Sequence, residues 1–379
     1  MKSLVLYAYP AEPDGQSLQG DMLYRGILNA NEEAIPCHFQ DSVQKEFYLK
    51  HVKPDVAFGI GFWGNVPEIV QTPLRYKVTP IPWFNADGWV ANYQEEFDKL
   101  DLMFTTSEWV RQIYKRDGVN VNKIIPMHIG IDTNLFKPTN RPDLNKAIKK
   151  MFGVDSHEKM ILTVGGDVTS KGAQEMMRAL ALIDKEYKDW KYICKSWPSD
   201  CSDDWREKEM ILADKLGIGD KVEFIDDEFS QEFMVHLLNA TDIYAAPSRI
   251  EGYGMIQVEA MSCAKPIISI NKMGPCETII HNKTGLLAGV DEEIKLDREW
   301  AFEHMGFNKK HIVEFKEPKT FGYRANIEDL RKHTLNLLED EELVKQMGEN
   351  ARKHVVKNLD YRNISQKMLE ITKKKLGLD

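Results

Sequence analysis

Two glutamates eight residues apart carry the strongest chemical signal in this sequence. Glu251 follows the apolar run 243–245, and Glu259 stands between the apolar residues Val258 and Ala260. On a helix this spacing brings two side chains back to nearly one face, where their carboxylates can accept hydrogen bonds from sugar and ribose hydroxyls. A glutamate also suits the start of a helix, but a solvated carboxylate is not expected within such an apolar stretch. The spacing therefore indicates a ligand site.

The turn that holds the first glutamate is suited to an anion. Gly252, Tyr253 and Gly254 lie between the end of an apolar run and the start of a helical pattern. Glycines let the backbone approach a ligand closely, and a helix N-terminus presents N–H groups and a favourable dipole to negative charge. We therefore expect an anion to bind at this turn.

A lysine occupies a similar place earlier in the chain. The apolar run 160–164 is followed by Gly165 and Gly166, and Lys171 stands where the next helical pattern opens. An ammonium group at a helix N-terminus is unfavourable unless an anion lies between them. This arrangement predicts a bound diphosphate.

Residues 247–261 resemble the signature of the retaining glycosyltransferases of family 4, whose fold is called GT-B. Two glutamates separated by seven residues lie in the donor site of that family. The resemblance implies that Glu251 holds hydroxyls of the transferred sugar, that Glu259 holds the ribose, and that the backbone of 252–254 meets sugar and phosphate. Similar motifs at 107–110, 129–136, 274–277 and 284–287 extend the resemblance over most of the chain.

The same resemblance gives the lysine a role in binding phosphate. The family has its phosphate-binding lysine at the position of Lys171, and usually an arginine at the position that is Gly166 here. We expect Gly166 to lie in the donor site, with the arginine's contact either absent or supplied from elsewhere. Lys195, after the next apolar run, is either that supplier or an ordinary surface lysine.

Two residues of the first half complete the implied site. The family has a glycine-containing loop that reaches toward the donor diphosphate, and Gly15 is the nearest match; a flexible turn is the alternative. The family often has a histidine near the anomeric carbon, and Asp87 stands in its place as a candidate catalytic residue. The alternative for Asp87 is a turn, because Asp-Gly favours turns.

The elements that must position these residues alternate along the chain. Short apolar runs separated by longer helical patterns predict βαβ units and parallel sheets. The proline-containing segment 136–142 interrupts the series, so the prediction is α/β, a GT-B arrangement of two Rossmann-like, doubly wound domains facing a cleft. We expect an acceptor-binding domain at 1–140 and a nucleotide-sugar domain at 141–359, with the terminal helix 360–379 packing back on the first. The charged stretch 291–326 is expected to be a surface insertion.

The charge and composition of the chain limit the classes of molecule that it is expected to bind. The 379 residues carry a formal net charge of −9, which discourages nucleic-acid binding. The five cysteines are scattered, without metal-ligand spacing, and no apolar run suits a signal peptide or a membrane span. These features predict a cytoplasmic protein with reduced thiols. A peripheral membrane contact through Lys373, Lys374 and Lys375 stays an alternative to a solvated helix end.

The sequence also leaves rival functions open. Residues 59–64 fit the dinucleotide fingerprint G-x-G-x-x-G, so a nicotinamide-dependent oxidoreductase, a sugar-nucleotide epimerase and a non-catalytic sugar-nucleotide-binding relative remain alternatives. No Asp-x-Asp pair is present to hold a diphosphate through a metal. The interpretation we favour is a metal-independent retaining transferase that moves a hexose from a UDP- or GDP-sugar to a hydroxyl of a glycan, a lipid-linked or a small-molecule acceptor. The nucleotide sugar is its co-substrate, and no cofactor is expected.

Overall fold

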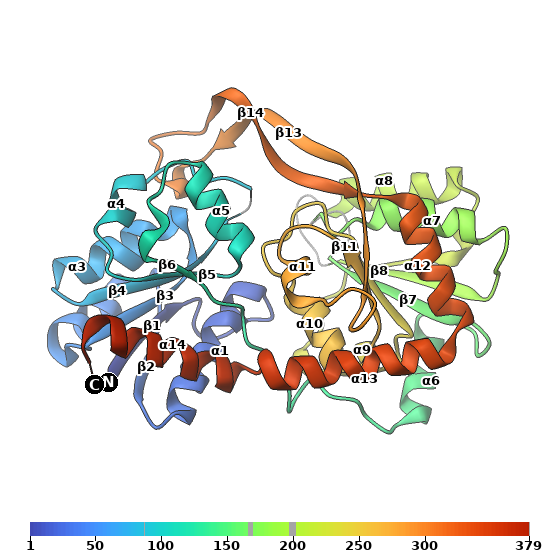
Figure 1. Ribbon diagram of the computed structural model, residues 1–379, viewed down its shortest axis with the longest axis horizontal. Coiled ribbons are helices and arrows are strands. Elements are labelled where there is room, and N and C mark those ends of the chain that lie inside the picture. The colour runs from blue at the N-terminus through green and yellow to red at the C-terminus, as the bar shows by residue number, and fades with distance from the viewer. Residues whose placement is uncertain (87, 166–169, 197–201, 379) are drawn as a thin grey trace. The chain divides into compact units, whose positions relative to one another are not determined.

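The computed structural model describes residues 1–86, 88–165, 170–196 and 202–378. The chain divides into two compact units. The first comprises Met1–Asp132, Lys295–Phe321 and Asn358–Asp379, and the second comprises Thr133–Ile294 and Gly322–Lys357. Each unit contains a six-stranded sheet with helices beside it, as Figure 1 shows. The prediction of an α/β protein with two Rossmann-like units is confirmed.

The sheet of the first unit has the order β2-β1-β3-β4-β5-β6, and its strand pairs are parallel. Its central strands are buried almost throughout, which explains their continuous apolar runs. The strands are β1 Lys2–Tyr7, β2 Glu33–His38, β3 Val56–Phe62, β4 Thr79–Asn85, β5 Met103–Thr105 and β6 Ile124–Pro126. The strand order turns back between β1 and β3, so the carboxyl ends of these two strands mark a switch point.

Helices connect these strands, and the C-terminal helix joins them. They are α1 Gly15–Asn29, α2 Ser42–Phe47, α3 Thr72–Arg75, α4 Gln94–Asp98, α5 Glu108–Arg116 and α14 Tyr361–Leu376. Helix α14 packs along α1. A Cβ atom at Gly26 would meet the Ser365 Oγ at 2.0 Å, so a glycine lets the two helices approach closely. Lys373 pairs with Glu32, which engages one of the three terminal lysines in an ion pair within this unit.

The sheet of the second unit has the order β12-β11-β10-β7-β8-β9, and its strand pairs are also parallel. The strands are β7 Lys159–Val164, β8 Trp190–Lys195, β9 Val222–Ile225, β10 Ile243–Ala246, β11 Ile267–Ile270 and β12 Leu286–Ala288. The helices are α6 Pro142–Met151, α7 Ala173–Ile183, α8 Ser202–Lys215, α9 Gln231–Ala240, α10 Met255–Ser262, α11 Pro275–Thr278, α12 Ile327–Glu339 and α13 Glu341–Asn358. The order turns back between β7 and β10, which places a second switch point there.

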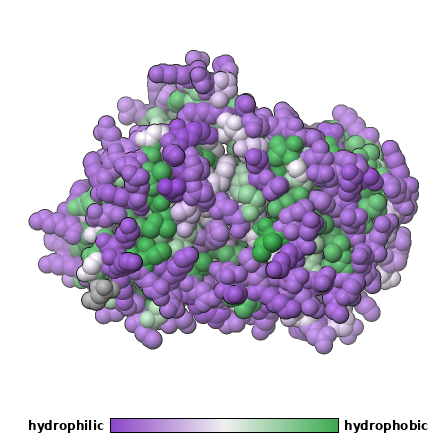
Figure 2. All heavy atoms as spheres, viewed as in Figure 1, coloured by the Kyte–Doolittle hydropathy of each residue, from purple (hydrophilic) through white to green (hydrophobic). Residues whose placement is uncertain are grey.

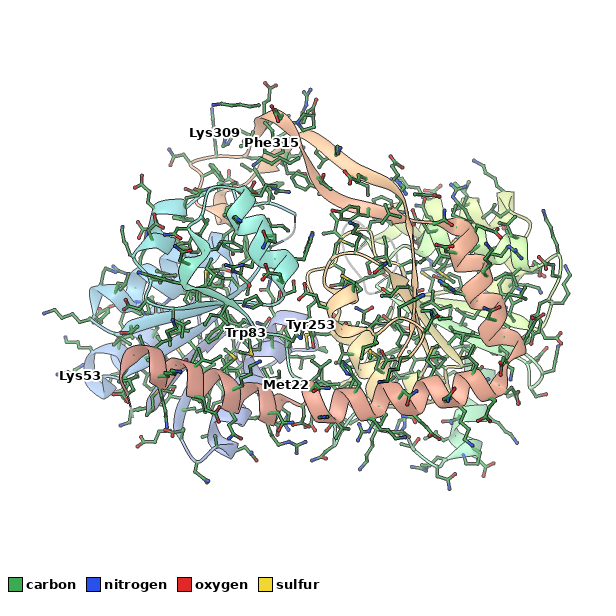
Figure 3. All side chains as sticks on the ribbon, in the orientation of Figure 1. Met22, Lys53, Trp83, Tyr253, Lys309 and Phe315 are labelled. Atoms are coloured by element: carbon green, nitrogen blue, oxygen red, sulfur yellow. The ribbon has the colours of Figure 1, made fainter. Side chains whose placement is uncertain are left out.

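The charged stretch after β12 forms a two-stranded sheet of β13 Val290–Ala301 and β14 His311–Ala325. We call this segment the hairpin (Figure 1). Its outer part belongs to the first unit, where Leu296, Val313 and Phe315 pack against a core cluster that contains Trp89. Phe315, labelled in Figure 3, lies on β14 with its ring centroid 5.5 Å from that of Trp89. The stretch is therefore more than a surface insertion, because it contributes to a core.

The visible surface is largely hydrophilic, with hydrophobic residues in small separate areas (Figure 2). Within the part of the chain that the structure describes, no helix combines the length and the apolar character needed to cross a membrane. Four of the cysteines are thiols that take part in no disulfide among the described residues: Cys37, Cys194, Cys263 and Cys276. Cys201 lies outside the described residues.

Candidate functional site

The candidate site lies at the switch point of the second sheet. Strands β7 and β10 pair in parallel, with Ile161 opposite Ile243 and Leu162 opposite Tyr244. Their carboxyl ends therefore meet at one edge of the sheet. The segment that leaves β7 carries Lys171, and the segment that leaves β10 carries Glu251. Ligands of open α/β sheets bind at such an edge.

Lys171 and Glu251 form an ion pair between Nζ and Oε2. Both side chains are largely buried. The pair joins the lysine expected to bind phosphate to the glutamate expected to hold the sugar, although 80 residues separate them in the chain. The structure thus brings these two predicted residues together.

The two segments also contact each other through their backbones. The Arg249 N–H donates to the Ser170 carbonyl oxygen at 2.7 Å. Gly172 caps α7 with a φ of +77°, and a Cβ atom there would meet the Pro247 carbonyl oxygen at 2.2 Å. A glycine is needed at this position for the close approach and for the left-handed conformation. The result is a fixed spacing between the lysine and glutamate segments.

Glu259 lies on α10, which begins after Gly254 at a φ of +94°. Its side chain is only 4% exposed. Burial raises the pKa of Glu259 to about 8. A buried carboxyl with a strongly raised pKa is a candidate for contact with a ligand hydroxyl.

The two glutamates act on a common neighbour. Tyr244, the second residue of β10, is fully buried, and burial raises its pKa, with further contributions from the charges of Glu251 and Glu259. Both carboxylates therefore lie within electrostatic range of one phenol. The helical spacing expected for the two glutamates is not what relates them, because α10 begins at Met255 and Glu251 lies in the segment before it. Tyr244 was not among the predicted site residues, because a tyrosine in a strand is usually a core residue.

The turn between the glutamates is closely packed. Gly274 donates its N–H to the Glu251 carbonyl oxygen at 3.1 Å, and a Cβ atom at Gly274 would meet the Gly252 carbonyl oxygen at 2.5 Å. Tyr253, labelled in Figure 3, is buried, and its N–H donates to the Glu251 carboxylate at 3.4 Å. The expected donor-binding residues Gly252, Tyr253 and Gly254 thus belong to one ordered turn.

The other predicted residues are distributed differently. Asp87 and Gly166 lie outside the described residues. Gly15 begins α1 in the first unit, directly after the Asp14 side chain that caps this helix. Lys195 is not the ordinary surface lysine that one interpretation allowed: it is 5% exposed, and its Nζ lies 5.2 Å from the centre of the Phe229 ring. Burial lowers the pKa of Lys195, against the opposing effect of nearby acidic groups.

The dinucleotide-like motif has a structural explanation. Gly59 and Gly61 lie inside β3 and not in a turn after it. A Cβ atom at Gly59 would meet Ile69 at 2.0 Å, and one at Gly61 would meet Asn65 at 2.4 Å. These glycines make room for neighbouring side chains of the same unit, so the motif gives no support to a nicotinamide site.

The side chains that could ligate a metal are dispersed. Among the described residues, no group of three or more His, Cys, Asp or Glu side chains is arranged to hold a metal ion.

Comparison with known proteins adds a family. Residues 145–299 match the family model described as Glycosyl transferases group 1. The D-inositol 3-phosphate glycosyltransferase of Mycolicibacterium smegmatis is 28% identical over 177 residues, which are 46% of this chain and 39% of that protein. A protein of the same name from Mycobacterium sp. strain KMS is 27% identical over 51% of this chain and 42% of its own length. The match thus spans about two fifths of these relatives.

Solved structures show the fold. HepE of Anabaena, in complex with UDP, has a TM-score of 0.72 at 15% identity and covers 99% of this chain and 100% of that chain. Sucrose-phosphate synthase from Thermosynechococcus elongatus has a TM-score of 0.74 at 16% identity and covers 100% of both chains. The fold is therefore the GT-B fold expected from the sequence.

Proposed function

We propose that this chain, whose residues 145–299 match the Glycosyl transferases group 1 family model, transfers a sugar from a nucleoside diphosphate sugar to a hydroxyl acceptor. The observation that carries the proposal is the ion pair of Lys171 and Glu251, together with the burial of Glu259 on the helix that follows Glu251. A cation for phosphate and two acceptors for hydroxyls are what a sugar nucleotide requires. UDP is the nucleotide we favour, since HepE was solved with UDP and with UDP-glucose. A GDP-sugar is the alternative donor.

Each of the three side chains has a distinct task in this proposal. The Lys171 ammonium leaves Glu251 for the diphosphate and stabilises the charge that grows on the departing phosphate; one well-placed donor of this kind is worth roughly 3 kcal/mol. Glu251 then accepts hydrogen bonds from hydroxyls of the transferred sugar. Glu259 accepts from the ribose, and those bonds favour its ionised form.

The reaction we propose retains the anomeric configuration. The bond between the anomeric carbon and the phosphate oxygen breaks, and the acceptor hydroxyl attacks from the same face. Its proton passes to the departing phosphate, so neither a protein nucleophile nor a metal is required. We assign Asp87 to the surroundings of the anomeric carbon, and Gly15 and Gly166 to backbone contacts with the diphosphate. The acceptor is a glycan, a lipid-linked sugar or a small molecule.

A donor panel tests the proposal. Purified protein is mixed with UDP-, GDP- and ADP-sugars, and both thermal stabilisation and nucleotide release are measured. We expect one nucleotide class to stabilise the protein, and the anomeric configuration of the product, determined by NMR, to match that of the donor. If no nucleotide sugar stabilises the protein or is turned over, the assignment of this site is wrong.

A further inference from the structure

Glu175 and Arg249, which are buried, form a cluster with the partly exposed Arg324 next to the segments that carry Lys171 and Glu251. Glu175, in the first turn of α7, is 4% exposed and accepts hydrogen bonds from two arginines. Arg249 approaches it with Nε at 3.1 and 3.2 Å from the two carboxylate oxygens and with Nη2 at 2.9 Å from Oε2. The Nη1 of Arg324, on β14, donates to Oε1 at 2.6 Å. All three residues belong to the second unit.

The cluster connects the two segments of the site. Glu175 follows Lys171 by four residues, and Arg249 precedes Glu251 by two. A single carboxylate therefore ties the segment that carries the lysine to the segment that carries the glutamate. Arg249 is 8% exposed, so removing the Glu175 carboxylate would take an opposite charge away from a buried guanidinium, which is unfavourable.

The end of β14 also contacts the segment that carries Arg249 and Glu251. The Tyr323 N–H donates to the Arg249 carbonyl oxygen at 2.8 Å. A Cβ atom at Gly322 would meet that same oxygen at 2.2 Å. The end of strand β14 thus packs directly against the segment that carries Glu251.

We propose that Glu175 and Arg324 are positioning residues, which hold Arg249 and thereby fix the Glu251 carboxylate and the Lys171 ammonium for the donor. The catalytic consequence rests on the function proposed above. The hairpin, which the sequence suggested was a surface insertion, supplies the residue that completes the cluster. Electrostatics support the arrangement: burial raises the pKa of Glu175, but hydrogen bonds and charge from the two arginines outweigh this and hold its pKa below the ordinary value.

The main test uses Arg324→Gln, because Arg324 is 41% exposed and its loss is compatible with folding. The matched control is Arg331→Gln on α12. It removes two ion pairs within the same unit, one with Glu328 and one with Glu186. Amide hydrogen exchange is followed at Arg249, Tyr323 and Gly274. We expect Arg324→Gln to speed exchange at these amides about tenfold and the control to leave it unchanged. Glu175→Gln should act in the same direction and more strongly.

Steady-state kinetics on the best donor provides the second measurement. We expect Arg324→Gln to raise the donor KM about fivefold. Arg324→Lys should restore most of the loss, because Arg324 meets Glu175 through Nη1 alone, which an ammonium can replace, while its Nε pairs with Glu292. Partial unfolding alone would lower kcat and leave KM unchanged. Unchanged exchange in both Arg324→Gln and Glu175→Gln would overturn the positioning role. Faster exchange in a protein that turns over no nucleotide sugar would instead overturn the proposed function.

Discussion

Lys171 and Glu251 meet as an ion pair although each follows a different strand of the second sheet. The pair exists because β7 and β10 are neighbours whose connections run in opposite directions. The strand order of the sheet therefore brings the lysine and the glutamate to the same edge.

Removal of either member of the pair tests the site directly. We expect Lys171→Ala and Glu251→Ala each to lower turnover by about tenfold or more, because each removes a contact to the donor. The measurement is nucleotide release with the best donor, with circular dichroism to establish that the fold persists. Lys188→Ala is the control, since it removes the ion pair of an exposed lysine with Asp184 in the same unit. Full activity in either site variant would contradict the assignment.

The stability of the free protein should depend on the ionisation of Glu259. Burial raises the pKa of Glu259 from 4.5 to about 8, so the folded state holds its proton over a range in which the unfolded state has lost it. Stability is then greatest below pH 4.5 for this group and falls as pH rises toward 8, by at most about 1.4 kcal/mol per pH unit. Glu259→Gln removes this dependence.

Thermal unfolding at pH 6 and at pH 8.5 measures the effect. We expect the melting temperature of the wild type to fall over this interval and that of Glu259→Gln to fall less. A sugar nucleotide whose hydroxyls donate hydrogen bonds to the ionised carboxyl should also bind the wild type more tightly at the higher pH. Parallel curves for the two proteins would show that burial does not raise the pKa of Glu259.

Gly172 should be intolerant of any side chain. An alanine there would place its Cβ against the Pro247 carbonyl oxygen, in addition to the strain of a φ of +77°. Gly217 is a matched control, because it has a φ of +74° and no atom lies within 4 Å of the position that a Cβ would take. We expect Gly217→Ala to cost about 1 kcal/mol and Gly172→Ala clearly more, with loss of activity. Equal unfolding free energies in urea would argue against the close contact.

The outer part of the hairpin should stabilise the first unit. Phe321 is 3% exposed, and its ring lies 6.3 Å from that of Trp89. We expect Phe321→Ala to destabilise the protein by about 3–5 kcal/mol. Ile312→Ala, on the same strand but 42% exposed, should change stability by less than about 0.5 kcal/mol. Chemical denaturation followed by tryptophan fluorescence separates the two, and similar losses would mean that the hairpin does not contribute to this core.

The sequence predicts those parts of the structure that depend on local pattern. Buried parallel strands appear as apolar runs, and Lys171 and Glu251 lie in the segments that follow two such runs. Strand β2 was not predicted, because Pro36 and its mixed burial conceal an edge strand that has a neighbour on one side only. The hairpin was also missed as a sheet, although Ile294, Leu296 and Val313 carry an alternating signal that the abundant charges obscure.

The cluster next to the site could not be predicted for a different reason. Glu175, Arg249 and Arg324 are far apart in the sequence, and only Arg249 lies within a segment that the sequence analysis singled out. A helical glutamate and an arginine in a charged stretch are usually solvated. Only the fold reveals that the three share one hydrogen-bonded network.

Neither unit corresponds to an uninterrupted length of chain, since the first is assembled from three stretches. A protein truncated after Asp132 would lack Phe315 and Phe321, which pack near Trp89, and it would lack helix α14, which packs along α1. Such a fragment would expose apolar surface on two faces and would tend to aggregate. Dissecting this protein into separately soluble halves therefore requires rejoining distant segments, for example by circular permutation, and not simply choosing a cut site.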